Sequence, residues 1–199
     1  MLYGVRRSMK YRAVDSGDKL CFSVNPLALL AVATAFYFAD AGTLIPFLEA
    51  VLWHEMGHLS VLLLFGCRIE EIKLELGGLC IRYAGAPGPC ADATAALAGP
   101  LAGLLYAFSA ARTGPRGELS AAFSIWLSAF NMIPALPLDG GRVIDALFGP
   151  TAAGLLGMIS AAVLAVGGLI LFFAGKGISL AMSGILLLAY QVTLISKAP

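Results

Sequence analysis

The sequence predicts an α-helical membrane protein with about six transmembrane helices and a small membrane-associated β-hairpin after the second of them. Hydrophobic residues make up 59% of the 199-residue chain and charged residues only 13%, and the mean hydropathy is +0.87. Soluble globular domains carry about twice that share of charged residues. Several apolar runs also approach the roughly 20 residues that a helix needs to cross a bilayer. We expect residues 1–199 to form a single transmembrane domain, with a basic leader at about 1–20 and a core at about 22–195.

The composition also excludes several classes of protein. The formal net charge is +1, and no basic tract is long enough to follow a phosphate backbone, so we expect no nucleic-acid partner. The cysteines have no C-x-x-C spacing, which favours small apolar residues over a disulfide framework or a zinc knuckle. They are Cys21, Cys67, Cys80 and Cys90.

The N-terminal part is predicted to contain the leader and two spans. Five cations lie within residues 1–20, and an apolar run follows at about residues 22–39. A cleaved signal peptide is the alternative, because Ala39-Asp40-Ala41 resembles a cleavage site. The leader is long for a signal peptide, however, and the run approaches spanning length. The second helix is expected over about residues 44–65.

A change of pattern after residue 66 predicts a β-hairpin. Apolar and polar residues alternate over part of residues 68–76, Gly77-Gly78 can form the turn, and residues 79–83 can return as the second strand. A hairpin of this size is marginally stable alone, so we expect it to lie against the rest of the protein. An exposed edge within residues 68–83 could hold an extended substrate by strand addition. A purely structural hairpin is the alternative.

The rest of the chain is predicted to contain the other four spans. Pro100 should bend the third span, while Gly99 and Gly103 permit close helix contact. Residues 131–142 contain two prolines and a Gly pair, so their backbone should be irregular and either buried in protein or in contact with a wet cavity. The predicted ranges are about residues 91–111, a polar loop at 112–118, a helix at 119–133, a short helical turn at 143–147, and helices at 152–174 and 178–195.

Six spans place both termini on one side of the membrane. The cations of the leader and Lys197 favour the cytoplasm, because cytoplasmic segments carry an excess of Lys and Arg. The C-terminal half of the second helix and the hairpin then lie nearer the cytoplasmic side. Arg112 and Arg116 fall outside in this topology, which argues modestly against it.

The second helix carries the segment with the most chemistry, His54-Glu55-Met56-Gly57-His58. Helical spacing puts both imidazoles on one face, where they can bind one Zn²⁺ ion, and puts Glu55 beside them, where its carboxylate can act on a water molecule. The chain has no other histidine. Ionisable groups in an apolar membrane segment are costly and usually functional. A polar cluster that packs against other helices without a metal is the less favoured alternative.

A catalytic zinc site uses three protein ligands and leaves one position open. Without a third histidine, the remaining ligand should be a carboxylate or, less favourably, a cysteine. The candidates are Glu49, Asp92, Asp139 and Asp145. Glu49 projects about 140° away from the first histidine around the helix, Asp92 is expected to cap a helix, and Asp145 is expected to pair with Arg142. Asp139 is preferred because it lies in the irregular segment that requires a cavity.

These segments resemble the site-2 protease family of intramembrane zinc metalloproteases. The family carries H-E-x-x-H in one transmembrane helix and N-x-x-P-x-x-x-L-D-G in a later one, and both patterns are present, at residues 54–58 and 131–140. Ala98-Gly99-Pro100-Leu101-Ala102 is similar to the family's glycine-proline element, although Gly103 stands where many members carry Asn. The resemblance covers about residues 44–147. It is greatest to the compact branch that processes an inactive sigma-factor precursor during sporulation.

The resemblance implies one zinc ion per chain, bound by His54, His58 and Asp139, with Glu55 as the catalytic base. It implies hydrolysis of a peptide bond in or next to a membrane segment of a protein substrate, in a bacterial plasma membrane with both termini cytoplasmic. The expected partners are that membrane-associated substrate, the lipid bilayer and a regulatory membrane protein. Asn131 is expected to bind the substrate backbone, and capping of the broken helix explains it equally well.

Two other functions compete with proteolysis. The first is a catalytically inactive membrane scaffold that binds a partner transmembrane helix. The intact Glu55 and the full set of ligands argue against it, because an inactive relative would most easily have lost one of them. The second is a metal transporter, which would need ionisable residues spread over several spans rather than clustered at one depth.

Overall fold

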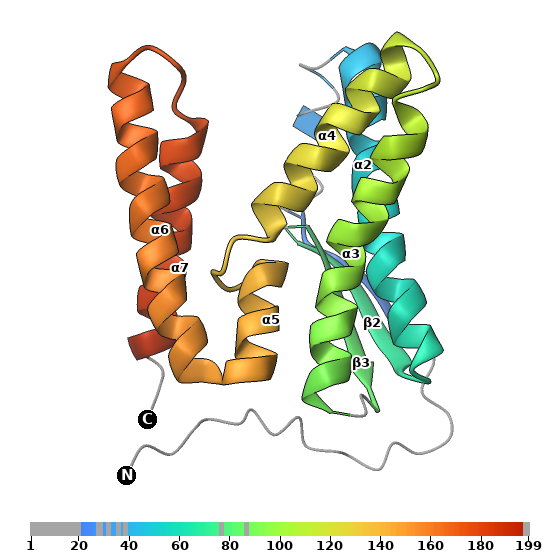
Figure 1. Ribbon diagram of the computed structural model, residues 1–199, viewed down its shortest axis with the longest axis vertical. Coiled ribbons are helices and arrows are strands. Elements are labelled where there is room, and N and C mark those ends of the chain that lie inside the picture. The colour runs from blue at the N-terminus through green and yellow to red at the C-terminus, as the bar shows by residue number, and fades with distance from the viewer. Residues whose placement is uncertain are drawn as a thin grey trace. The chain divides into compact units, whose positions relative to one another are not determined.

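The computed structural model describes residues 21–26, 30, 33–34, 37, 40–75, 78–85 and 88–196. The basic leader, most of the predicted first span and Lys197 lie outside these residues, so the orientation of the termini stays a prediction. The described residues form six helices, α2 to α7, and three strands (Figure 1). Three of these helices, α2, α3 and α6, are long and apolar enough to cross a membrane, and α7 is shorter but also apolar. The chain is a multi-pass membrane protein, and the predicted fold class is confirmed.

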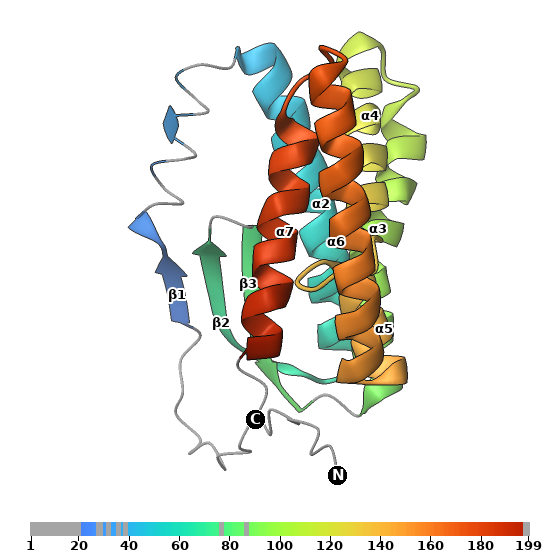
Figure 2. The ribbon, with the colours of Figure 1, turned by 90° about the vertical axis from the view of Figure 1, so that its left-hand side faces the viewer.

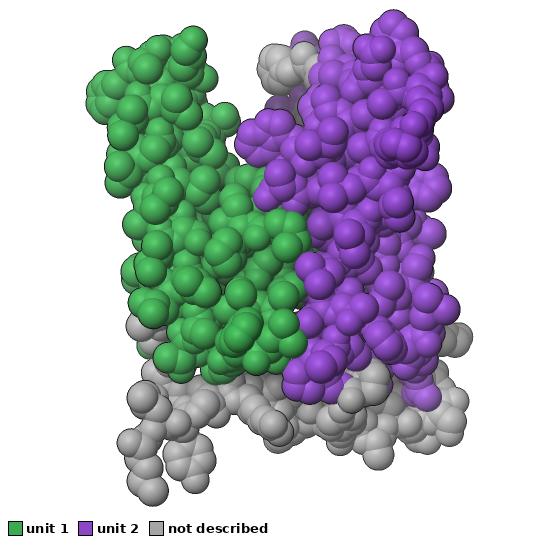
Figure 3. All heavy atoms as spheres, in the orientation of Figure 1, with its two compact units in different colours: residues 1–8, 130–199 green, residues 9–129 purple. Residues whose placement is uncertain are grey.

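The chain divides into two compact units, shown in different colours in Figure 3. Among the described residues, 21–129 belong to the unit drawn in purple, which is labelled unit 2 in Figure 3 and is called the first unit here because it comes first in the chain. Residues 130–196 belong to the unit drawn in green, which is labelled unit 1 in Figure 3 and is called the second unit here. The predicted single domain over residues 1–199 stays a prediction. The helix α4 (Pro115–Asn131) begins in the first unit, and its last two residues belong to the second.

The first unit contains a three-stranded sheet with the order β1-β2-β3 (Figure 2). The predicted hairpin is confirmed as β2 (Arg68–Glu75) and β3 (Gly78–Ala84), which pair antiparallel. The additional strand β1 (Cys21–Val24) pairs parallel with β2, so the prediction of a helix from residue 22 is wrong at this end. Pro26 explains the difference, because a proline disfavours the helical conformation of the residue before it and a helix therefore does not extend back through Asn25.

The helices of the first unit are α2 (Ala41–Leu64), α3 (Pro89–Ala110) and most of α4. Asp40 caps α2, because its carboxylate accepts hydrogen bonds from the backbone N–H and the hydroxyl of Thr43 at 2.9 and 3.0 Å. The helix α4 begins at Pro115, so the predicted polar loop at 112–118 is wrong over its second half. A proline suits the first turn of a helix, where its missing N–H would have no helical partner.

The second unit contains α5 (Asp139–Phe148), α6 (Pro150–Phe173) and α7 (Ser179–Ser196). Residues 132–138 are not helical and include a cis Leu136–Pro137 bond, which confirms the predicted irregular backbone there. Our prediction extended this irregular segment to residue 142, but α5 already begins at Asp139 and includes the Gly pair. The glycines are needed for contact: a Cβ at Gly140 would lie 2.2 Å from the carbonyl oxygen of Met132, and one at Gly141 would lie 2.4 Å from the carbonyl carbon of Ala135.

Small residues make up most of the buried apolar positions that the structure describes. Most buried apolar side chains among the described residues are alanines, whereas many large apolar side chains are exposed. In the second unit, a Cβ at Gly168 of α6 would lie 2.3 Å from the backbone nitrogen of Ala181 in α7, and a Cβ at Gly184 would lie 2.3 Å from that of Ala165. Close approach of helix backbones through small residues is typical of membrane proteins, where lipid covers the large apolar side chains.

Candidate metal centre

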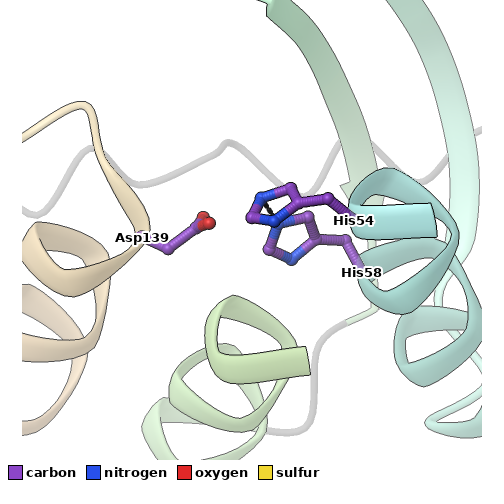
Figure 4. Close-up of side chains that lie close together, drawn as sticks. All are labelled: His54, His58 and Asp139. Carbon is purple, nitrogen blue, oxygen red and sulfur yellow. Dashed lines mark hydrogen bonds between the residues drawn. The ribbon is translucent and has the colours of Figure 1, made fainter. Parts of the chain in front are cut away.

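The helix α2 carries both histidines on one buried face. His54 is 4% exposed and His58 is 6% exposed. Their Nε2 atoms lie 3.2 Å apart, and the ring planes are inclined by 80° (Figure 4). Two zinc-bound nitrogens in a tetrahedral site, with Zn–N distances of about 2.0–2.1 Å, are separated by about 3.3 Å. The spacing of the two Nε2 atoms therefore fits a shared zinc ion.

A backbone carbonyl of α3 fixes the ring of His58. Nδ1 of His58 lies 2.7 Å from the carbonyl oxygen of Ala95. A carbonyl oxygen can only accept a hydrogen bond, so Nδ1 carries the proton and the lone pair is on Nε2. Metal-binding histidines commonly donate their second ring N–H to a carbonyl in this way, which sets both the tautomer and the orientation of the ring. This contact could not be predicted from the sequence because it depends on a backbone atom.

Two glycines allow α3 to approach the histidines this closely. A Cβ at Gly99 would lie 2.2 Å from Nε2 of His58, so the backbone of α3 lies against the ring. A Cβ at Gly57, inside the H-E-x-x-H segment, would lie 2.3 Å from the carbonyl oxygen of Ala98. The predicted close helix contact at Gly99 is therefore present, and it involves a metal-ligand candidate directly.

Glu55 follows His54 in α2 and is partly buried. Its Cα–Cβ direction is about 100° away from that of His54 around the helix axis. Glu55 is therefore beside the buried face of the two histidines rather than on it. A carboxylate in this position can accept a proton from a water molecule held in front of the imidazoles.

Asp139 is the first residue of α5 in the second unit and is only 6% exposed. Its Oδ1 lies 3.4 Å from Nη1 of Arg142, so Arg142 pairs with Asp139 rather than with Asp145 as we predicted. The positive end of the helix dipole also favours a charged carboxylate in the first turn. Asp139 thus offers a buried carboxylate, which is a ligand type that zinc accepts beside two imidazoles. Figure 4 draws the side chains of His54 and His58 on α2 and of Asp139 on α5.

Glu49 is occupied by other contacts in the first unit. Its carboxylate accepts hydrogen bonds from the hydroxyls of Tyr106 in α3, at 3.0 Å, and Ser120 in α4, at 2.8 Å. It also forms an ion pair with Arg116. These partners explain Glu49 as a link between three helices, in agreement with its rejection as a ligand.

The other two carboxylate candidates are not favoured as ligands either. Asp92 accepts a hydrogen bond of 2.8 Å from the hydroxyl of Tyr83 in β3. It lies in the first turn of α3, and the N-cap is Gly88, so the predicted capping role of Asp92 is wrong. Asp145 is exposed on α5.

The cysteines that the structure describes as free, Cys67 and Cys90, give no sign of metal binding. Cys67 is buried between α2 and β2 against Leu62 and Ala95. Burial raises the pKa of its thiol, and the nearby negative charge of Asp92 acts in the same direction. The neutral thiol is a poor zinc ligand, because zinc binds the thiolate.

Asn131 was expected to bind the substrate backbone, and Gly103 was expected to permit close helix contact where many members of the resembled family carry Asn. Asn131 is the last residue of α4 and is partly buried, and its expected contact with substrate stays a prediction. At Gly103, where many members of the resembled family carry Asn, a Cβ would lie 2.6 Å from Oγ of Ser128. Ser128 is buried and donates a hydrogen bond of 3.0 Å to the carbonyl oxygen of Pro100. The small residue at position 103 therefore admits a hydroxyl from α4 that sequence reasoning did not identify.

Comparison with known proteins identifies the family of the chain. The family described as "Peptidase M50B-like" matches residues 27–138. Rip3 of Mycobacterium tuberculosis, a predicted zinc metalloprotease by its name, is 30% identical over 166 residues, which cover 72% of this chain and 42% of Rip3. The protein sll0528 of Synechocystis, also named as a zinc metalloprotease, is 32% identical over 109 residues. These residues cover 49% of this chain and 29% of that protein. The chain thus spans less than half the length of these curated relatives.

The fold is also similar to a solved structure. The site-2 protease from Methanocaldococcus jannaschii superposes with a TM-score of 0.61 at 21% sequence identity. The alignment covers 90% of this chain and 93% of that one. At this level of identity the likeness concerns the arrangement of helices and strands.

Proposed function

Because the chain belongs to the Peptidase M50B-like family, we propose that it is a zinc metalloprotease that hydrolyses a peptide bond in or next to a membrane segment of a protein substrate. The observation that carries the proposal is the pair of buried imidazoles on α2, whose Nε2 atoms lie 3.2 Å apart while the ring of His58 is held by a carbonyl of α3. Ionisable groups buried in a membrane helix are costly and usually functional, which favours a metal site over a polar cluster that only packs against other helices.

The proposed ligands are His54, His58 and Asp139. Two neutral imidazoles and one carboxylate are a common donor set for catalytic zinc and leave one position open. The burial of Asp139 supports its role, because a buried carboxylate is costly unless it is paired or coordinates a metal. When bound, zinc supplies a water molecule that is activated near neutral pH and an electrophile that polarises the scissile carbonyl.

Glu55 is the proposed catalytic base. Its carboxylate takes the proton of the attacking water and then delivers it to the nitrogen of the leaving amine. His54 and His58 act as neutral ligands throughout, and the Ala95 carbonyl keeps the Nδ1 proton of His58 in place. Asn131 is proposed to hold the substrate backbone near the site.

The sheet offers a way to hold a substrate in extended form. Among the described strands, in the order β1-β2-β3, β2 is paired on both sides and β3 has β2 as its one neighbour, so β3 is the outer strand of the predicted hairpin. Of the range 68–83 in which an exposed edge was expected, the β2 residues that also pair with β1, such as Ile72 and Leu74, are therefore interior to the sheet. We propose that an unwound substrate segment adds as a strand along β3.

The orientation of the chain in the membrane and the identity of the substrate are proposed from the sequence. The leader cations and Lys197 support cytoplasmic termini, which reporter fusions at Pro199 and within residues 113–117 test. An extracytoplasmic C-terminus would contradict the six-span topology. Processing of a sigma-factor precursor during sporulation rests on the motif resemblance alone, and co-expression with such a precursor would test it.

The experiment that tests the proposed function compares wild type with Glu55→Gln, both purified in detergent. Zinc content and cleavage of a labelled single-span membrane polypeptide are measured together, with Glu118→Gln as a control at an exposed carboxylate of α4. A protease binds zinc in all three proteins and loses cleavage in Glu55→Gln. A scaffold shows no cleavage in any of them. A transporter shows zinc uptake into vesicles that does not require proteolysis.

A further inference from the structure

We propose that Gln191 of α7 is a positioning residue that holds the segment before Asp139 in the geometry required for metal binding. This inference rests on the proposed function, because it assigns Gln191 a role only if Asp139 is a zinc ligand. It concerns a residue far from both sequence motifs, and everything that supports it lies within the second unit.

Gln191 is an unusual residue for its position. Its side chain is fully buried in α7, a helix that is otherwise largely apolar, and it is the largest fully buried side chain among the described residues. Burial of an amide costs free energy unless it is hydrogen-bonded. An apolar side chain of similar size would avoid that cost, so packing alone does not explain an amide here.

The amide of Gln191 binds the backbone that leads to Asp139. Its Nε2 donates a hydrogen bond of 2.7 Å to the carbonyl oxygen of Leu136. Leu136 lies in the non-helical segment 132–138, three residues before Asp139. A carbonyl in irregular backbone has no helical N–H partner, and a buried carbonyl at membrane depth needs one. Gln191 provides this partner from a helix 55 residues further along the chain.

Two sets of glycines complete this arrangement. Gly157 of α6 makes room for the amide, because a Cβ there would lie 2.8 Å from the amide carbon, nitrogen and oxygen of Gln191. Gly140 and Gly141 let the first turn of α5 lie against the same segment, since Cβ atoms there would meet the backbone of Met132 and Ala135. The segment is therefore fixed by α7 on one side and by the first turn of α5 on the other.

The position of Asp139 follows from these contacts. Asp139 begins α5, and its carboxylate is attached to the chain directly after the segment that Gln191 holds. Metal ligands depend on the groups that orient them, and loss of such a group typically costs about 10- to 100-fold in metal affinity or activity. The hydrogen bond of Gln191 goes to Leu136 and not to Asp139 itself, so the proposed role of Gln191 is positioning.

The test measures the zinc affinity of the purified full-length protein by competition with a chelator. Gln191→Met removes the donor with little change in volume, and Leu187→Met on the same helix is the matched control. We expect Gln191→Met to bind zinc about 10- to 100-fold more weakly than wild type, and Leu187→Met to match wild type. The visible absorption of the Co²⁺-substituted protein should change in the same variant, because it reports coordination geometry independently of proteolysis.

A double-mutant comparison distinguishes positioning from general destabilisation. In an Asp139→Ala background, Gln191→Met should change zinc affinity by less than about twofold, because the ligand that it positions is absent. An equal loss in both backgrounds would overturn the inference. Unchanged zinc affinity in Gln191→Met, with binding that still depends on Asp139, would also overturn it. A wild-type protein without Asp139-dependent zinc binding would instead overturn the proposed function.

A second variant keeps the inference testable if Gln191→Met does not fold. Gly157→Ala displaces the amide from the α6 side without removing it, and Gly154→Ala, where a Cβ meets nothing within 4 Å, is its control. We expect Gly157→Ala to weaken zinc binding and Gly154→Ala to leave it unchanged. Equal zinc affinity in these two variants would count against the role of Gln191.

Discussion

Gly99→Ala is expected to damage the proposed zinc site without removing any ligand. The added Cβ would lie 2.2 Å from Nε2, 2.5 Å from Cε1 and 2.7 Å from Cδ2 of His58. Ordinary carbon–carbon contacts are about 3.5–4.0 Å, so the ring or the helix must move by more than about 1 Å. Either movement also disturbs the 2.7 Å hydrogen bond from His58 to Ala95.

The size of the effect follows from both changes. Misplacement of a reacting group by about 1 Å can cost about 100-fold in rate, and loss of the partner of a metal-binding histidine costs about 10- to 100-fold in affinity or activity. We therefore expect Gly99→Ala to weaken zinc binding at least tenfold and to reduce cleavage by about 100-fold or more. Gly99→Ser should be at least as damaging.

The assay compares Gly99→Ala with two other glycine variants. Gly167→Ala, in α6, meets nothing within 4 Å and controls for the change in helix propensity. Gly57→Ala collides with the backbone of α3 at Ala98, and so separates the helices without touching the ring. Zinc affinity by chelator competition and kcat/KM are measured for all three. Wild-type zinc affinity and cleavage in Gly99→Ala would refute the close contact between α3 and His58.

Three further predictions concern carboxylates and the sheet edge. Glu55→Gln should keep near-stoichiometric zinc and lose about 10²–10⁴-fold in cleavage rate, whereas Asp139→Ala should lose both cleavage and most of its zinc. If metal analysis finds that Glu55→Gln loses zinc and Asp139→Ala keeps it, Glu55 is the ligand and Asp139 is not. Glu49→Gln should keep its zinc but lower the free energy of unfolding by about 1–3 kcal/mol, because it weakens charged hydrogen bonds between three helices, and loss of zinc would contradict this. Cys80 and Ile81 are successive residues of β3, so their N–H groups point in opposite directions, one toward β2 and one away from it. Proline at the residue whose N–H points away from β2 should preserve folding and zinc binding but reduce cleavage. Unchanged cleavage in that folded variant would count against strand addition.

The elements and the histidine pair could be predicted because their signals are local. Apolar runs of spanning length and the alternation in residues 68–76 are properties of single segments, and the structure contains the hairpin and the helices that correspond to the second to sixth predicted spans. The spacing of His54 and His58 likewise fixes their common face through helix geometry alone. The predicted helix starts failed where a proline decided the boundary, at Pro26 and Pro115.

The surroundings of the ligands could not be predicted because they are tertiary. Gly140-Gly141 was interpreted as a helix breaker, and the sequence does not reveal that these glycines lie inside α5 against the backbone of residues 132–136. The partner of His58 is a carbonyl, and backbone atoms leave no mark on residue identity. Gln191 differs in this respect, because an amide in an apolar helix is visible in the sequence. Its hydrogen-bond partner, Leu136, could not be predicted because it lies 55 residues away.

The glycines near the proposed ligands have a common physical basis. In a soluble enzyme, burial of large apolar side chains presses the elements together, but lipid removes that driving force between membrane helices. The buried interior of this protein is accordingly made largely of alanine, and close backbone contacts take the place of a large core. A Cβ at Gly99 or Gly140 would collide with His58 or with the segment before Asp139. The positions of the proposed ligands therefore depend on glycine at these positions. A single added methyl group there should impair metal binding before it unfolds the protein.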